Sequence, residues 1–180
     1  MSRLKQPDPV KPIAAVFSAD RSRLALAARR LEEIIGRLDF AGPEMIFDQT
    51  EYYRAEMGRP LVKRFFSAEN LVDPADLVEI KVRCVELEAG FSEQGKRTVN
   101  IDPGYVSAER LVLATGKNFI HRIYLGRGVW ADLTLIFEGG RFRPLPWTYP
   151  DYAAEDVLEV MTDIRNKYLD QIRLKRQEER

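Results

Sequence analysis

Residues 96–147 constrain the fold most, because short apolar runs alternate there with glycine- and proline-rich turn signals. The signals are Asp102-Pro103-Gly104, which fits a type II turn, Gly126-Arg127-Gly128 and Gly139-Gly140. Runs and turns of this kind are typical of a β-meander. Strands are expected at residues 98–101, 111–114, 120–125, 129–137 and 141–143. Several connections are short enough for hairpins, so the sheet should be mainly antiparallel.

Helices are expected beside this sheet. Apolar side chains recur at three- and four-residue steps over residues 21–38, 74–90 and 153–175. Further strands are expected at residues 12–17, 44–47 and 61–67. The resulting order of strand, helix, strand, strand, helix, strand matches a split βαβ, or ferredoxin-like, unit. The sequence therefore predicts an α+β fold with a candidate ferredoxin-like core, an extended meander and a C-terminal helix.

The length of 180 residues and the 45% share of hydrophobic residues suit a single domain. We expect a flexible tail at residues 1–11, the domain at 12–175 and a charged tail at 176–180. The N-terminus lacks an apolar signal-peptide core, and no apolar run approaches the ~20 residues of a membrane span. The one cysteine, Cys84, excludes an intrachain disulfide and is expected to be buried on its helix. These features predict a cytoplasmic protein with no membrane partner.

The charge balance argues against a dedicated nucleic-acid binder. The chain has 28 basic and 28 acidic residues, so its net charge is zero. RNA binding on an open sheet face, through Arg122, Tyr124 and the arginine-rich first helix, is therefore the weakest alternative.

The meander concentrates the polar residues that could form a site. Alternation along two adjacent strands places Arg122, Tyr124, Asp132 and Thr134 on one face. Such a face could bind a polar or anionic ligand. The alternative is a solvated face with cross-strand pairs such as Arg122 with Asp132.

His121 and Asp102 are the catalytic candidates. Histidine titrates near neutrality and a carboxylate can orient it, so the two could form an acid–base pair. The competing interpretations are a partly buried, hydrogen-bonded histidine and an ordinary turn aspartate.

Further candidates could bind an anionic ligand. Arg64, Lys117 and Arg122 could hold the anion, and Tyr53 and Trp147 could form aromatic walls. Asp151 is a further candidate, beside the last helix. Thr115-Gly116-Lys117 is not a phosphate-binding P-loop, because Leu111 and Asn118 occupy the positions that need glycine and Ser or Thr. No spacing predicts a metal site, and no motif identifies a cofactor.

Four motifs carry a family resemblance: FDQTEYYRAEMG (47–58), NIDPGY (100–105), LATGKNFIHRIYLG (113–126) and WTYPDY (147–152). Together they resemble an uncharacterised bacterial family, the domain of unknown function 4416, over about residues 11–168. The resemblance implies a single-domain bacterial cytosolic protein and no particular function. Members often carry a GTP-binding label, which the missing P-loop does not support here.

Two functions follow as expectations. The first is a small bacterial enzyme or ligand-binding protein for a phosphorylated or otherwise anionic small molecule, with nucleotides among the candidates. The second is a non-catalytic interaction module, whose C-terminal helix and aromatic loop would bind another protein or a second copy in a homo-oligomer.

Overall fold

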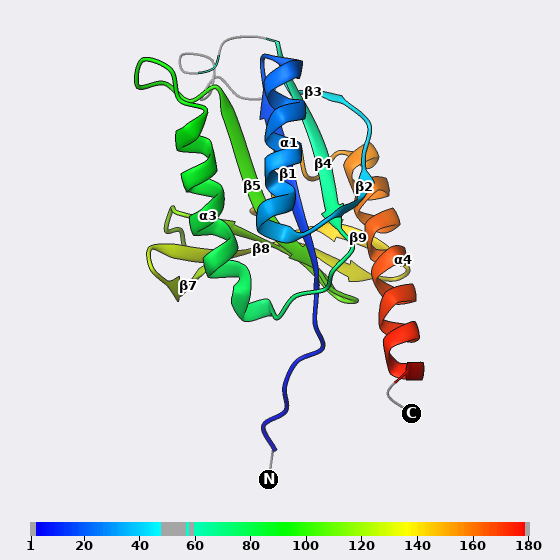
Figure 1. Ribbon diagram of the computed structural model, residues 1–180. Helices are drawn as coiled ribbons and strands as arrows, with labels where there is room; N and C mark the ends of the chain where they lie inside the picture. Colours follow the sequence, from blue (N-terminus) through cyan, green and yellow to red (C-terminus); the bar gives the residue numbers. More distant parts are fainter. Residues whose placement is uncertain (1–2, 48–56, 58–59, 179–180) are drawn as a thin grey trace.

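The computed structural model describes residues 3–47, 57 and 60–178. These residues form three α-helices and a nine-stranded sheet in which all pairings are antiparallel (Figure 1). About 35% of the chain is helix and 36% is strand, so the α+β class expected from the sequence is confirmed. None of the helices within the described ranges combines the length and the apolar character needed to cross a membrane.

The sheet has the strand order β2-β4-β1-β5-β6-β8-β7, with β3 beside β4 and β9 beside β8. The strands are β1 Lys11–Ser18, β2 Leu38–Ala41, β3 Met45–Phe47, β4 Leu61–Ala68, β5 Val99–Val106, β6 Arg110–Thr115, β7 Arg122–Gly126, β8 Val129–Glu138 and β9 Arg141–Pro144.

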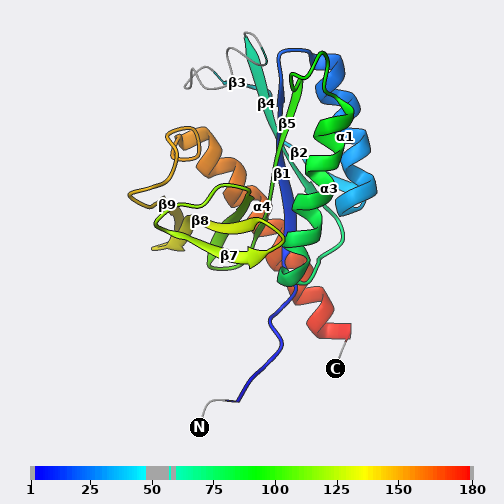
Figure 2. The ribbon, with the colours of Figure 1, turned by 90° about the vertical axis from the view of Figure 1, so that its left-hand side faces the viewer.

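Helices α1 (Arg21–Ile35) and α3 (Leu77–Gly90) cover one face of the β2-β4-β1-β5 half (Figure 2). Their apolar stripes pack on alternate residues of the strands, among them Ala14, Val16 and Ile101. Asp20 caps α1, because its side chain accepts hydrogen bonds from two N–H groups of the first turn. This strand order and the shared helix face are what a ferredoxin-like core requires, and that finer interpretation stays a prediction.

Helix α4 (Glu155–Glu178) packs on the opposite side of the sheet. Its apolar stripe, including Met161 and Ile164, contacts Ile13 and Phe65 in a second core cluster. The buried Lys11 reinforces this contact, because its ammonium donates to Asp39, to a backbone carbonyl and to a side chain of α4. The C-terminal helix is thus part of the chain's own core.

The prediction of a turn at Asp102-Pro103-Gly104 is wrong, because all three residues lie inside β5. Strand β1 pairs along the whole of β5, whereas β6 pairs only with residues 104–106. A Cβ atom at position 104 would lie 2.4 Å from the carbonyl oxygen of Val112. The glycine is therefore required by the close approach of β6 rather than by a turn.

Several boundaries also differ from the sequence prediction, and two of them change the position of a predicted residue. The first helix was expected to reach Leu38, but it ends at Gly36, which has a φ of 91°, and Leu38 begins strand β2. Strand β7 begins at Arg122, so His121 lies in the preceding loop and not on a sheet face.

Candidate functional site

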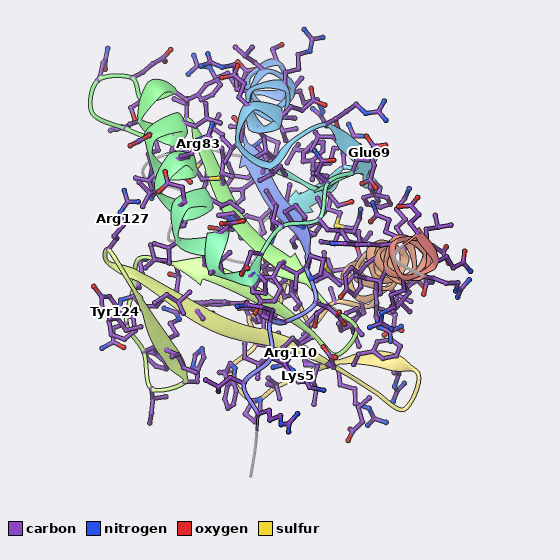
Figure 3. The ribbon with its side chains drawn as sticks, turned by 60° about the horizontal axis from the view of Figure 1, so that its bottom comes forward. Lys5, Glu69, Arg83, Arg110, Tyr124 and Arg127 are labelled. Atoms are coloured by element: carbon purple, nitrogen blue, oxygen red, sulfur yellow. The ribbon has the colours of Figure 1, made fainter. Side chains whose placement is uncertain are left out.

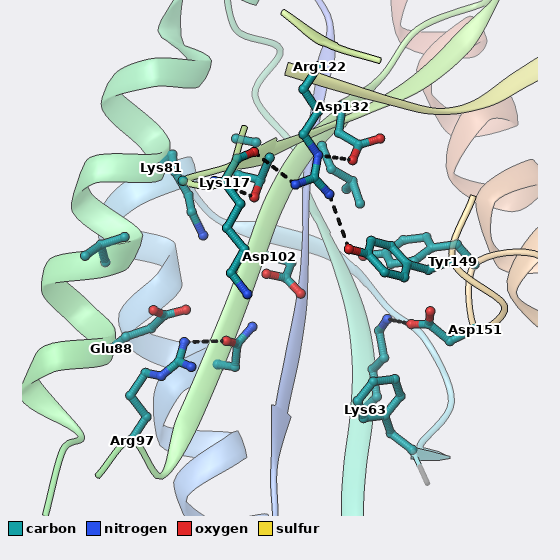
Figure 4. A pocket seen from close by; sticks show the side chains of 18 of the residues that line it. Lys63, Lys81, Glu88, Arg97, Asp102, Lys117, Arg122, Asp132, Tyr149 and Asp151 are labelled. Atoms are coloured by element: carbon teal, nitrogen blue, oxygen red, sulfur yellow. Dashed lines mark hydrogen bonds and ion pairs between the residues drawn. The ribbon is translucent and has the colours of Figure 1, made fainter. Parts of the chain in front are cut away.

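A cavity of about 760 Å³ opens where β6 diverges from β5 (Figure 4). Helix α3 forms one wall, and the part of β5 that does not pair with β6 forms the back. The end of β6 with its following loop and the segment before α4 form further parts of the lining, and single residues of β3, β4, β7 and β8 also contribute. The site therefore brings together segments of residues 63–102, 113–132 and 149–152 that are far apart in the sequence.

The cavity lining is rich in charge. Among the described residues it contains five cationic side chains, Lys63, Lys81, Arg97, Lys117 and Arg122, and four carboxylic acids, Glu88, Asp102, Asp132 and Asp151. Charged side chains are rarely buried unless they are paired or serve a function, so this concentration marks a candidate site.

Two side chains of α3 form hydrogen bonds with the backbone of β5 in the part of the strand with which β6 does not pair. Lys81 donates to the carbonyl oxygen of Ile101 at 3.2 Å, and Glu88 accepts from the N–H of Ile101 at 2.5 Å. Lys81 and Glu88 are seven residues, or two helical turns, apart and so lie on one face of α3. They satisfy the backbone of β5 at the place where β6 has left it.

Glu88 is the carboxyl group whose protonation is most affected by the fold. Its side chain is buried, and burial raises its pKa to about 7. Lys81 and the Ile101 N–H oppose this rise, whereas the charge of Asp102 adds to it. Glu88 can therefore exchange a proton near neutral pH, as a general acid or base must. The neighbouring Cys84 cannot act as a thiolate there, because burial raises its pKa to about 12.

Arg122 organises the opposite side of the cavity. Its guanidinium donates to Asp132 at 2.8 Å, to the carbonyl oxygen of Lys117 at 2.9 Å and to the Tyr149 hydroxyl at 3.3 Å (Figure 4). These bonds fix the loop after β6 against the segment before α4. Arg122 thereby positions Lys117 at the rim of the cavity.

His121 lies behind Asp132, outside the cavity lining. Its Nε2 atom is 3.2 Å from Asp132 Oδ2, and its ring stacks on Trp147 with the centroids 4.9 Å apart. The structure thus pairs His121 with Asp132 and not with Asp102. Asp132 contacts both His121 and Arg122 and so links the histidine to the cavity lining.

Lys63 is a further charged residue of the cavity lining. Its ammonium contacts Asp151 at 2.6 Å and lies 4.0 Å from the centroid of the Tyr152 ring. Phe17, Phe47 and Phe65 also surround this ammonium. The carboxylate and the aromatic faces stabilise the cation in a buried position.

The structure brings together five of the site residues predicted from the sequence: Asp102, Lys117, Arg122, Asp132 and Asp151. Trp147 is not among the described residues of the lining; its ring stacks on His121, and its indole donates to the carbonyl oxygen of Leu133.

Two other candidates, Arg64 and Tyr124, do not line the cavity, and a third, Tyr53, cannot be placed. Arg64 donates to the carbonyl oxygen of Gly42 at 2.6 Å. Tyr124 lies on the outside of β7 and is 56% exposed (Figure 3). Tyr53 lies outside the described residues.

Sequence reasoning missed four of the charged lining residues, Lys63, Lys81, Glu88 and Arg97. A signal existed for two of them. Leu77, Lys81, Cys84 and Glu88 follow one another at steps of four, three and four, so the two charges continue the buried stripe of α3. Charges within a buried stripe should have been taken as site candidates.

Comparison with known proteins identifies the family alone. The model of the domain of unknown function 4416 matches residues 8–168. No curated protein and no solved structure matches the chain. The family match includes every described residue of the cavity lining. The chain belongs to the family of the domain of unknown function 4416.

Proposed function

We propose that the cavity binds a phosphorylated or otherwise anionic small molecule, as part of a small bacterial cytosolic enzyme or ligand-binding protein. The observation that carries the proposal is the excess of cationic over anionic groups around a cavity of ligand size. Among the described lining residues, five cations face four carboxyl groups, and burial raises the pKa of Glu88 to about 7, which favours its neutral form. A volume of about 760 Å³ lies within the usual range for small-molecule sites.

Two ion pairs join described residues of the lining. Asp151 neutralises Lys63 and Asp132 neutralises Arg122. Lys81, Arg97 and Lys117 line the cavity as well, together with Glu88 and Asp102. An anion entering from the rim would meet ammonium and guanidinium groups, which can bind phosphate.

Glu88 supports an enzymatic form of the proposal. A carboxyl group that titrates near neutral pH can take up or release a proton as a substrate reacts. Asp102 lines the same cavity and can act as the second carboxylate. Two carboxyl groups in one cavity are a common acid–base arrangement.

A thermal-shift screen tests the proposal with inorganic phosphate, sugar phosphates and nucleotides. A ligand at ~100 times its dissociation constant adds about 2.7 kcal/mol of stability, which raises the melting temperature by roughly 5–10 °C for a domain of this size. Lys117→Ala should reduce this shift by half or more, because Lys117 is an exposed cation at the rim.

Lys175→Ala is the matched control, since Lys175 is exposed on α4 and does not line the cavity. It should leave the ligand-induced shift unchanged. A flat screen, or equal losses in the two lysine variants, would contradict binding of an anion in the cavity.

A further inference from the structure

We infer that the ligand is a phosphorylated polyol, such as a sugar phosphate, whose hydroxyl groups bind Asn100 and Asp102. This inference rests on the proposed function and names the class of ligand. It follows from two polar side-chain groups at the back of the cavity that have no hydrogen-bond partner among the described residues.

Asn100 supplies an unmatched donor. Its side chain is only 3% exposed, and its Oδ1 atom accepts from Arg97 at 3.0 Å. This bond fixes the orientation of the amide and leaves Nδ2 as the remaining donor. Nδ2 is buried, and no described residue accepts a hydrogen bond from it. Buried donors are rarely left unsatisfied, so a ligand acceptor is expected at this atom.

Asp102 supplies an unmatched acceptor two residues further along β5. Residues two apart on a strand point to the same face, so Asn100 and Asp102 present their side chains side by side. The Asp102 carboxylate points into the cavity (Figure 4) and has no hydrogen bond or ion pair with the described residues. Strand β5 thus presents a hydrogen-bond donor, Asn100 Nδ2, and an acceptor, the Asp102 carboxylate, to the same cavity.

The chemistry of this pair selects hydroxyl groups. A phosphate oxygen could accept from Asn100, but its negative charge would repel the Asp102 carboxylate. An ammonium group could donate to Asp102, but Lys81, Arg97 and Lys117 would repel it. A hydroxyl group is uncharged and both donates and accepts, so one or two hydroxyls can satisfy both side chains.

The two parts of such a ligand fit different parts of the lining. Its phosphate would lie toward the cationic side chains, among which Lys117 marks the rim, and its hydroxyl groups would lie against β5. A site of this kind can discriminate strongly between ligands with and without hydroxyl groups. A ligand without hydroxyl groups leaves the polar groups of the protein without a hydrogen-bond partner.

The test compares two phosphate monoesters by isothermal titration calorimetry. Ribose 5-phosphate carries hydroxyl groups and ethyl phosphate does not, whereas their phosphate charges are alike. Ribose 5-phosphate should bind at least 10-fold more tightly to the wild-type protein. Asp102→Asn should remove most of this preference and should leave the affinity for inorganic phosphate equal or higher, because a negative charge is lost. Asp163→Asn is the control, because Asp163 is exposed on α4. It should change neither the preference for ribose 5-phosphate nor the affinity for inorganic phosphate.

The outcomes separate this inference from the proposed function. Equal affinity of the wild-type protein for the two esters would overturn the polyol assignment and leave phosphate binding intact. An equal loss of affinity for both esters in Asp102→Asn would also overturn it. Failure of all three phosphate compounds to bind would overturn the proposed function as well. The comparison of esters on the wild-type protein does not depend on how well a variant folds.

Discussion

Glu88 shows how burial changes the chemistry of a single side chain. The residue is 5% exposed, and its pKa of about 7 compares with an ordinary value of 4.5. Its raised pKa means that folding favours the protonated form. The side chain therefore costs no stability below about pH 4.5, and the cost grows as the pH rises to about 7 and is then fully present. A buried carboxyl group therefore lowers the stability of the fold at neutral pH. Such a loss of stability is expected where a residue serves a function.

This account predicts a pH-dependent effect of Glu88→Gln. Glutamine can still accept from the Ile101 N–H but never carries the buried charge. The variant should gain stability relative to wild type by roughly 3 kcal/mol more at pH 8 than at pH 4.5, since one pKa unit corresponds to about 1.4 kcal/mol. Urea unfolding at the two pH values measures the difference.

Glu86→Gln is the control on the same helix, because Glu86 is exposed. Its effect on the free energy of unfolding should be small at both pH values. A Glu88→Gln effect that is independent of pH would show that Glu88 does not titrate as described.

At the scale of elements, the divergence of β5 and β6 creates the cavity. The strands pair only at residues 104–106, and Gly104 allows them to approach closely there. Beyond this point β1 still pairs with β5, and α3 satisfies Ile101 through Lys81 and Glu88. The strands can therefore separate without leaving these backbone groups unsatisfied.

Gly104→Ala should consequently lower the free energy of unfolding by roughly 2–3 kcal/mol, because its Cβ would overlap the Val112 carbonyl and force the strands apart. Gly90→Ala is the control, since a Cβ at position 90 meets no atom within 4 Å at the end of α3. That variant should be neutral or stabilised by up to ~1 kcal/mol. Chemical denaturation of both proteins checks the contrast, and equal stabilities would contradict the close approach.

The sequence predicts elements better than their connections. Periodicity identifies α1, α3, α4 and the strands of the meander, because burial of one face imposes a repeat on the residues. It misassigned Asp102-Pro103-Gly104, since proline and glycine suit both a turn and a strand at which pairing ends. It also missed Lys81 and Glu88, whose role depends on where β5 lies in space. Local pattern does not encode contacts between distant segments.

At the scale of the whole molecule, the cavity lies where several parts of the fold meet. Helix α3 and the β2-β4-β1-β5 half contribute one side, and the end of β6 with the segments around Arg122 and Tyr149 contributes the other. Helix α4 buries its apolar stripe against the sheet, and Leu174 is its one large apolar residue among those exposed in the described part of the chain. Among the described residues, α4 thus directs most of its apolar side chains into the chain's own core.

The most direct test of a phosphate-binding cavity is an NMR titration of ¹⁵N-labelled protein with inorganic phosphate and with ribose 5-phosphate. The account predicts chemical-shift changes that cluster at Asn100, Asp102 and residues 115–117, including the Asn100 side-chain amide with the sugar phosphate. Changes confined to α4 or scattered over the surface, or an unchanged spectrum at millimolar ligand, would contradict it.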